Sequence, residues 1–129
     1  MDILLIAIVV AVATMALMQW WISYQARRMQ GRPLPQLPEP MAARLRERGK
    51  ALLYFYSRGC GPCRAMTPLV ERLSQQHDNV FLFDLSQDRV LAKTLRIMAT
   101  PTVLVITPKT IETVVVGQIN ESRLRQLLA

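Results

Sequence analysis

The sequence predicts an α/β domain with a mixed central sheet and helices on both faces, preceded by one transmembrane helix. Two observations support this prediction. Residues 3–18 form an apolar run without charge, and from Met41 onward apolar strands alternate with segments of helical periodicity. We therefore divide the chain into a transmembrane anchor over residues 1–24, a basic, proline-rich linker over 25–40 and a globular domain over 41–129.

The apolar run reads ILLIAIVVAVATMALM and is followed by Trp20 and Trp21. About 20 apolar residues span a bilayer as a helix, and tryptophan suits the interface between lipid and water. A cleaved signal peptide is the alternative, because Ala11-Val12-Ala13 resembles a cleavage motif. That motif comes early, however, and no Lys or Arg precedes the run. The pattern therefore favours an uncleaved anchor, so we expect a single-pass protein of the cell membrane.

Basic residues are concentrated just after the anchor. Residues 1–50 hold seven Lys and Arg against three Asp and Glu, in a chain of net charge +7. The positive-inside rule then predicts a cytoplasmic domain. A periplasmic or other extracytoplasmic face is the alternative, because a short anchor with weakly charged flanks can insert either way. The cluster suits an anionic membrane surface, and since no aromatic residues interleave with it, we expect no nucleic-acid partner.

The linker segment MQGRPLPQLPEP, residues 29–40, contains four of the eight prolines. Alternating prolines favour an extended chain, so we expect a spacer that holds the domain away from the membrane. A proline-motif ligand for another protein is the alternative interpretation.

The globular part alternates helices and strands along the chain. Helices are expected over 41–50, 63–76, 88–97 and 120–128, the last capped by Asn120, and strands over 51–57, 80–85, 102–106 and 111–116. The short connection between the last two strands predicts an antiparallel hairpin.

Both cysteines, Cys60 and Cys63, lie where the first strand gives way to a helix. A helix N-terminus stabilises a thiolate, so Cys60 is the expected nucleophile. Gly61 allows the chain to turn without a side-chain clash, and Pro62 fits the first helical turn. Cys63 lies one turn further and can resolve a mixed disulfide. The pattern predicts thiol–disulfide exchange.

Two other uses of the cysteine pair are less consistent with the sequence. A structural disulfide between residues three apart removes little chain entropy. A metal site needs about four ligands, yet His77 is the only histidine and there is no third cysteine. We therefore expect neither a metal nor another cofactor.

These motifs resemble the thioredoxin family. The resemblance rests on Cys60-Gly61-Pro62-Cys63, on Pro68, on Ala99-Thr100-Pro101-Thr102 and on Gly117, and it covers about residues 41–129. It implies a thioredoxin-like fold, protein disulfide substrates and an upstream dithiol electron donor. It also implies that Pro101 is cis and faces the cysteines, so that the backbone of Thr100 can pair with an extended substrate segment.

Three positions depart from the family pattern. Gly59 stands where thioredoxins usually carry a tryptophan, Tyr54 replaces their buried aspartate and Leu82 replaces the neighbouring lysine. These replacements leave the substrate range open, and they remove the acid that assists proton transfer at the second cysteine. For Tyr54, a core aromatic with a bonded hydroxyl is the simpler interpretation.

Together these features predict a membrane-anchored dithiol–disulfide oxidoreductase. The Gly61-Pro62 dipeptide resembles that of reducing family members, so we expect a reductant. The alternative is a non-catalytic module that binds a partner or delivers a metal through its two thiolates.

Overall fold

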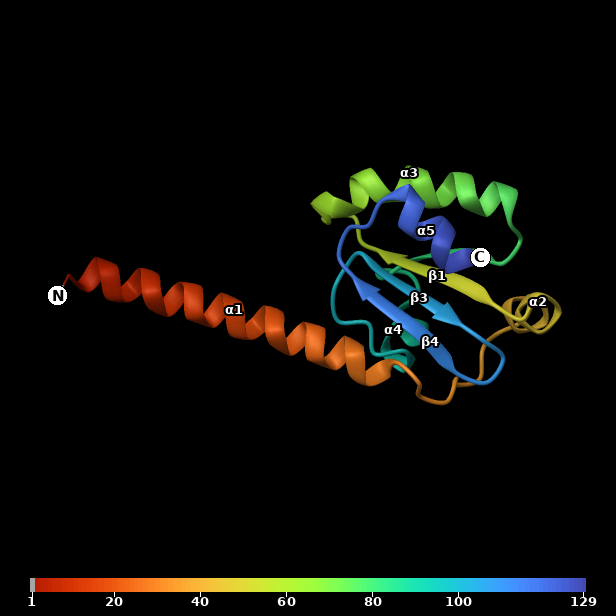
Figure 1. The fold of residues 1–129 in the computed structure, drawn as a ribbon, viewed down its shortest axis with the longest axis horizontal. Coiled ribbons are helices and arrows are strands. Elements are labelled where there is room, and N and C mark those ends of the chain that lie inside the picture. The colour runs from red at the N-terminus through yellow and green to blue at the C-terminus, as the bar shows by residue number, and fades with distance from the viewer. Residues whose placement is uncertain (1) are drawn as a thin grey trace.

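The computed structural model describes residues 2–129 (Figure 1). Four strands form one sheet in the order β2-β1-β3-β4. β1 pairs in parallel with β2 and antiparallel with β3, and β3 and β4 form the expected antiparallel hairpin. The predicted mixed sheet is therefore confirmed. In chain order the elements are α1 (Ile3–Met29), α2 (Met41–Arg48), β1 (Ala51–Tyr56), α3 (Gly61–Gln76), β2 (Val80–Asp84), α4 (Arg89–Thr94), β3 (Thr102–Ile106), β4 (Ile111–Val116) and α5 (Glu121–Leu128).

β1 lies at the centre of the sheet, and its side chains enter two hydrophobic clusters. Leu53 and Phe55 belong to the cluster that includes residues of α2 and α4. Leu52 and Tyr54 belong to the other cluster, with residues of α3 and α5. The alternation follows from the two-residue period of a strand. Helices consequently cover both faces of the sheet, and the strand end that carries the cysteines is held from both sides (Figure 1).

α4 is shorter than the helix expected over 88–97, because it ends at Thr94. The chain reverses at Arg96, which has a left-handed φ of 56°. The N–H of Arg96 donates to Lys93 (3.1 Å) and that of Ile97 donates to Ala92 (2.9 Å). This is the hydrogen-bond pattern of a Schellman motif, which usually places glycine at the left-handed position. Nothing in the residue type of Arg96 predicts this early end.

α1 is long and apolar enough to cross a membrane, and none of its most apolar 18-residue window is buried. The helix continues to Met29, past residue 24, where we expected the anchor to end. Its last turns contact β4, and Met29 is 8% exposed within the hydrophobic core. The helix therefore joins the domain through a packed junction.

The spacer expected over residues 29–40 is not free, because the segment Gly31–Leu34 pairs with Ile111 at the start of β4 and with the turn before it. The N–H of Gly31 donates to Ile111 (2.7 Å), the N–H of Ile111 donates to Arg32 (3.0 Å), and that of Leu34 donates to Lys109 (3.0 Å). A bridge forms between Pro33 and Thr110. We call Gly31–Leu34 the edge latch. It is extended as expected, but it occupies otherwise unpaired backbone groups of an edge strand.

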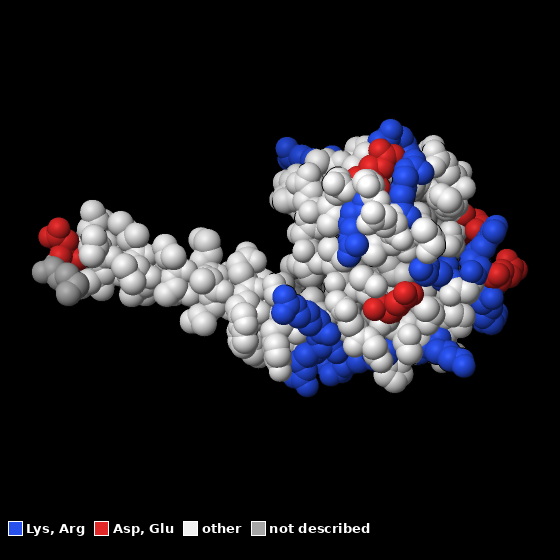
Figure 2. All heavy atoms as spheres, viewed as in Figure 1, with Lys and Arg blue, Asp and Glu red and all other residues white. Residues whose placement is uncertain are grey.

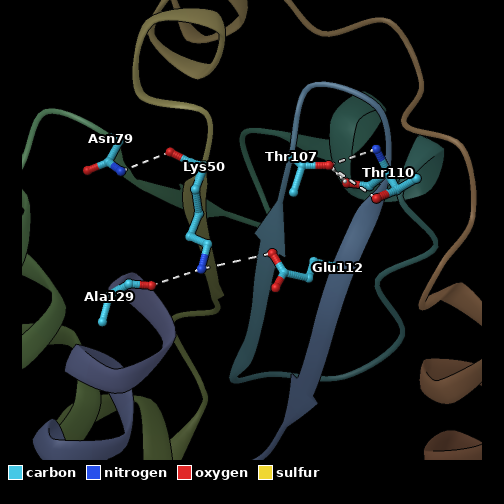
Figure 3. A network of polar contacts seen from close by, with 6 residues as sticks. All are labelled: Lys50, Asn79, Thr107, Thr110, Glu112 and Ala129. Atoms are coloured by element: carbon cyan, nitrogen blue, oxygen red, sulfur yellow. Dashed lines mark hydrogen bonds and ion pairs between the residues drawn. The ribbon is translucent and has the colours of Figure 1, made fainter.

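A polar network closes the end of the sheet where β1 begins and the β3–β4 turn lies (Figure 3). The Lys50 ammonium donates to the carbonyl of Ala129 (3.0 Å) and lies 4.0 Å from Glu112. The hydroxyls of Thr107 and Thr110 lie 3.1 Å apart across the turn. These contacts join the chain end to the sheet.

Candidate active site

Cys60 and Cys63 form a disulfide at the junction between β1 and α3, with their Cα atoms 5.3 Å apart. Cys60 is the N-cap of α3, and its sulfur accepts a hydrogen bond from the N–H of Cys63 at 3.2 Å. Pro62 occupies the first helical turn, as expected. After reduction, the same N–H and the positive end of the helix dipole would stabilise a thiolate on Cys60.

The two cysteine residues differ slightly in their exposure to solvent. Cys60 is 9% exposed, whereas Cys63 is 3% exposed. Cys60, at the start of the helix, is therefore the more exposed residue of the pair. This arrangement fits the order of events in which Cys60 attacks first and Cys63 resolves.

The steric reason that we gave for Gly61 is wrong. A Cβ atom built on Gly61 meets no other atom within 4 Å, and its φ lies outside the left-handed region. The same open space surrounds Gly59. A larger side chain would therefore fit at either position, and the absence of a tryptophan at Gly59 leaves the surface beside the sulfur open.

The loop before β3 lies beside the cysteine turn. The Thr100–Pro101 bond is cis, the geometry that the resemblance implied. The hydroxyls of Ser57 and Thr100 lie 2.9 Å apart, and the carbonyl of Ser57 accepts from the N–H of Cys60 at 3.3 Å. Ser57 thus links the two loops. Sequence reasoning missed this residue, whose only signal is its position directly after the first strand.

The backbone of Thr100 is free to pair with another chain. Within residues 2–129, neither its N–H nor its C=O forms a backbone hydrogen bond. The neighbouring Pro101 is held in place, because its carbonyl accepts from the N–H of Gly117 at 2.9 Å. An extended segment could add to the Thr100 backbone as a short strand, next to Cys60.

Tyr54 and Leu82 lie directly opposite each other in the parallel pair of β1 and β2. The Tyr54 ring is fully buried, and its hydroxyl lies 3.0 Å from that of Thr67 and 3.5 Å from the carbonyl of Cys63. Burial raises the pKa of Tyr54 above its ordinary value. The hydroxyl therefore stays protonated at neutral pH and cannot act as a base beneath Cys63. Thr67 was not singled out in the sequence.

Asp84 lies at the end of β2 and is tied to a residue next to the cysteines. It accepts from the N–H of Ser86 (2.9 Å) and from its hydroxyl (2.8 Å), and Arg58 lies 3.7 Å away. These bonds, with the Arg58 charge, lower the pKa of Asp84. The resulting stabilisation is present above the unfolded-state pKa and is lost as the pH falls through the folded-state pKa. The ion pair with Asp84 thus links Arg58, two residues before Cys60, to the end of β2.

His77 lies far from the two cysteines. Among residues 2–129, no group of three or more His, Cys, Asp or Glu side chains could hold a metal ion. His77 caps the opposite end of the 16-residue helix α3 from Cys60. That length separates the two residues by about 24 Å.

Comparison with known proteins identifies the family. The thioredoxin family model matches residues 39–129. The chain belongs to the thioredoxin family. It is 30% identical over 59 residues to thioredoxin of Borreliella burgdorferi, covering 43% of this chain and 50% of that protein. It is 38% identical over 56 residues to thioredoxin Asp f 28 of Aspergillus fumigatus, covering 42% of this chain and 52% of that protein.

The chain thus spans about half the length of these two relatives. A solved structure of a mutant thioredoxin from Halobacterium salinarum matches with a TM-score of 0.61 and 28% identity, over 72% of this chain and 83% of that one. The family and the thioredoxin-like fold expected from the cysteine and proline motifs are confirmed.

We predict that Tyr54→Phe lowers the free energy of unfolding by about 1 kcal/mol, the usual value of one buried hydrogen bond. Chemical unfolding followed by circular dichroism measures this change. Tyr56→Phe is the matched control on the same strand, because no hydrogen bond to its hydroxyl is seen among residues 2–129; it should change stability by less than about 0.5 kcal/mol.

The rate of disulfide reduction should stay within about twofold for Tyr54→Phe, since loss of a true acid–base group usually costs about a hundredfold or more. A fall of that size would assign the Tyr54 hydroxyl a role in proton transfer.

Proposed function

We propose that this protein is a membrane-anchored thiol–disulfide oxidoreductase that reduces disulfides in other proteins. The observation that carries the proposal is the cysteine pair at the start of α3, linked through Ser57 to the cis Thr100–Pro101 bond. Membership of the thioredoxin family supports the same chemistry. Gly59, Gly61 and Pro62 complete the active-site loop, and Thr100 and Pro101 form the substrate-binding surface.

In the proposed reaction, the Cys60 thiolate attacks one sulfur of a substrate disulfide and expels the other as a thiolate, which takes up a proton. Cys63, after losing a proton, then attacks the Cys60 sulfur and releases the substrate as a dithiol. The substrate gains two electrons, and the Cys60–Cys63 pair becomes the disulfide seen in the structure. An upstream dithiol donor would reduce this disulfide and complete the cycle.

We predict that Cys63→Ser accumulates mixed disulfides with substrate proteins through Cys60. The first attack remains possible, whereas the residue that resolves the adduct is gone. Nonreducing gel electrophoresis followed by mass spectrometry measures the adducts, and the double variant Cys60→Ser, Cys63→Ser is the control that should form none. A non-catalytic binding or metal-delivering module would retain its partner without a covalent adduct, so the absence of adducts in Cys63→Ser would reject catalysis.

We propose that the protein reduces substrate disulfides and does not form them, because Gly61-Pro62 resembles the dipeptide of reducing family members. We predict that the Cys60–Cys63 pair has a reduction potential of about −270 mV, the value for thioredoxin. Equilibration of the full chain with glutathione buffers, read by thiol alkylation, measures this potential. A value near about −120 mV, typical of a strong oxidant, would contradict the assignment.

The anchor is proposed to be residues 1–24, followed by the linker over 25–40 and the catalytic domain over 41–129. The apolar helix α1 and the basic residues after it support a single-pass protein with its domain in the cytoplasm. The alternative is a domain on the periplasmic or other extracytoplasmic face.

We predict that a membrane-impermeant maleimide labels Cys60 and Cys63 only after cell lysis, following mild reduction. A cytoplasmic domain lies behind the membrane and is shielded from this reagent. Lysed cells provide the control for full labelling. Labelling in intact cells would place the domain on the outer face and contradict the charge-based orientation.

A further inference from the structure

α1 lies beside β4 and runs toward the end of the sheet at which the active site lies. The edge latch pairs with Ile111 at the start of β4, and the Gln30 side chain donates to the carbonyl of Val114 at 3.2 Å. Further back along α1, Ile22 and Gln25 line a small cavity together with Val116 at the end of β4. Read toward the N-terminus, the chain from the edge latch through Gln30 into α1 therefore follows β4 from its first residue to its last.

The same cavity reaches the loop that carries the cis bond. Met98 and Ala99, which directly precede Thr100, line it opposite Ile22 and Ala26. Figure 1 shows α1 leaving the domain on the side where α3 begins, which is the side of the cysteines. The position of the active site relative to α1 is therefore fixed by contacts on one side of the domain.

The depth of this contact in a membrane follows from helix geometry. Residues 3–22 of α1 are twenty residues without a charged side chain, and at about 1.5 Å per residue they span about 30 Å, the thickness of the hydrocarbon core. Trp20 and Trp21 mark the end of that stretch. Ala26 lies about 6 Å further along the helix axis than Ile22. The headgroup layer is itself about 5–7 Å thick, so the cavity between α1 and the loop lies at its level.

The surface at this level suits contact with lipid. Met98 is 56% exposed and Val116 is 37% exposed, so apolar side chains are presented beside α1. Positive charge gathers where α1 meets the domain (Figure 2). Arg27 and Arg28 lie in the last turn of α1, and the Arg32 side chain donates to the carbonyl of Arg28. Basic side chains in this position attract anionic headgroups.

From this arrangement, and on the basis of the function proposed above, we infer that the domain is held with its active site facing the bilayer at headgroup level. Its substrates are then disulfides in membrane proteins, carried by extended segments that directly adjoin a membrane-spanning element. Disulfides that stand far from the membrane lie beyond the reach of Cys60, because the edge latch and the Met29 contact keep the domain from swinging outward.

The orientation is tested with the full chain carrying Cys60→Ser and Cys63→Ser, which removes both native cysteines. A fluorophore is attached to Met98→Cys, or to His77→Cys as the control at the far end of α3. The proteins are reconstituted into vesicles of phosphatidylcholine and phosphatidylglycerol that contain a headgroup-attached quencher. We expect severalfold stronger quenching at position 98 than at position 77. Equal quenching, or stronger quenching at position 77, would overturn the inferred orientation whether or not the protein reduces disulfides.

The substrate class is tested with three disulfide probes and the wild-type chain in the same vesicles. One probe has its disulfide loop next to a transmembrane helix, one carries the loop on a polyproline spacer of about 30 Å, and one is a soluble peptide. We expect the first probe to be reduced at least about tenfold faster than the second. Equal rates would overturn the inference, whereas no reduction of any probe would reject the proposed function instead.

A matched variant separates orientation from catalysis. It carries a flexible Gly/Ser insertion of about twelve residues after Gln30, together with Met29→Ser, which frees α1 from the domain while the edge latch stays on β4. We expect its rate on the soluble probe to be unchanged and the near-to-far ratio to fall toward one. A ratio that stays at the wild-type value, with the quenching difference intact, would show that the junction between α1 and the latched domain does not set the reach, and would overturn the inference.

Discussion

The structure depends on the burial of β1 between two helical layers. Its side chains enter hydrophobic clusters on both faces, and its backbone pairs with β2 on one side and β3 on the other. The chain that leaves this strand has little freedom, because Ser57 bonds both to the Cys60 N–H and to Thr100. A rigid strand end thereby places the cysteine turn and the cis Thr100–Pro101 bond side by side.

The environment of the second cysteine differs from the one that the family pattern implies. Tyr54 and Leu82 are paired in register where the family pattern has an acid and a lysine, and the Tyr54 hydroxyl bonds to Thr67. Burial keeps that hydroxyl protonated, so it can donate a hydrogen bond but cannot accept a proton from Cys63. In the proposed reaction, proton transfer at Cys63 would then use water or the substrate itself, which would bear on resolution more than on the first attack by Cys60.

The edge latch joins the apolar helix α1 to the start of β4 through backbone pairing rather than through side chains. The extended, proline-containing edge latch does not continue helix α1. It suits the open edge of β4, whose N–H and C=O groups need partners. With Met29 buried at the same junction, α1 and the sheet share one core. A segment that reads as a spacer thus becomes part of the sheet edge.

Much of this protein follows from local sequence. The charge-free run of residues 3–18 predicts a long apolar helix, and the alternation of apolar periods predicts the order of the elements. Cys60 and Pro62 begin α3 through ordinary capping chemistry. Contacts between distant residues were decided only by the tertiary structure. Ser57 and Thr100 are 43 positions apart, the edge latch pairs with a strand about 80 residues further along the chain, and α4 ends early because Ile97 must turn back into the core. Local propensity cannot encode such pairings, because they depend on which backbone groups the assembled sheet leaves open.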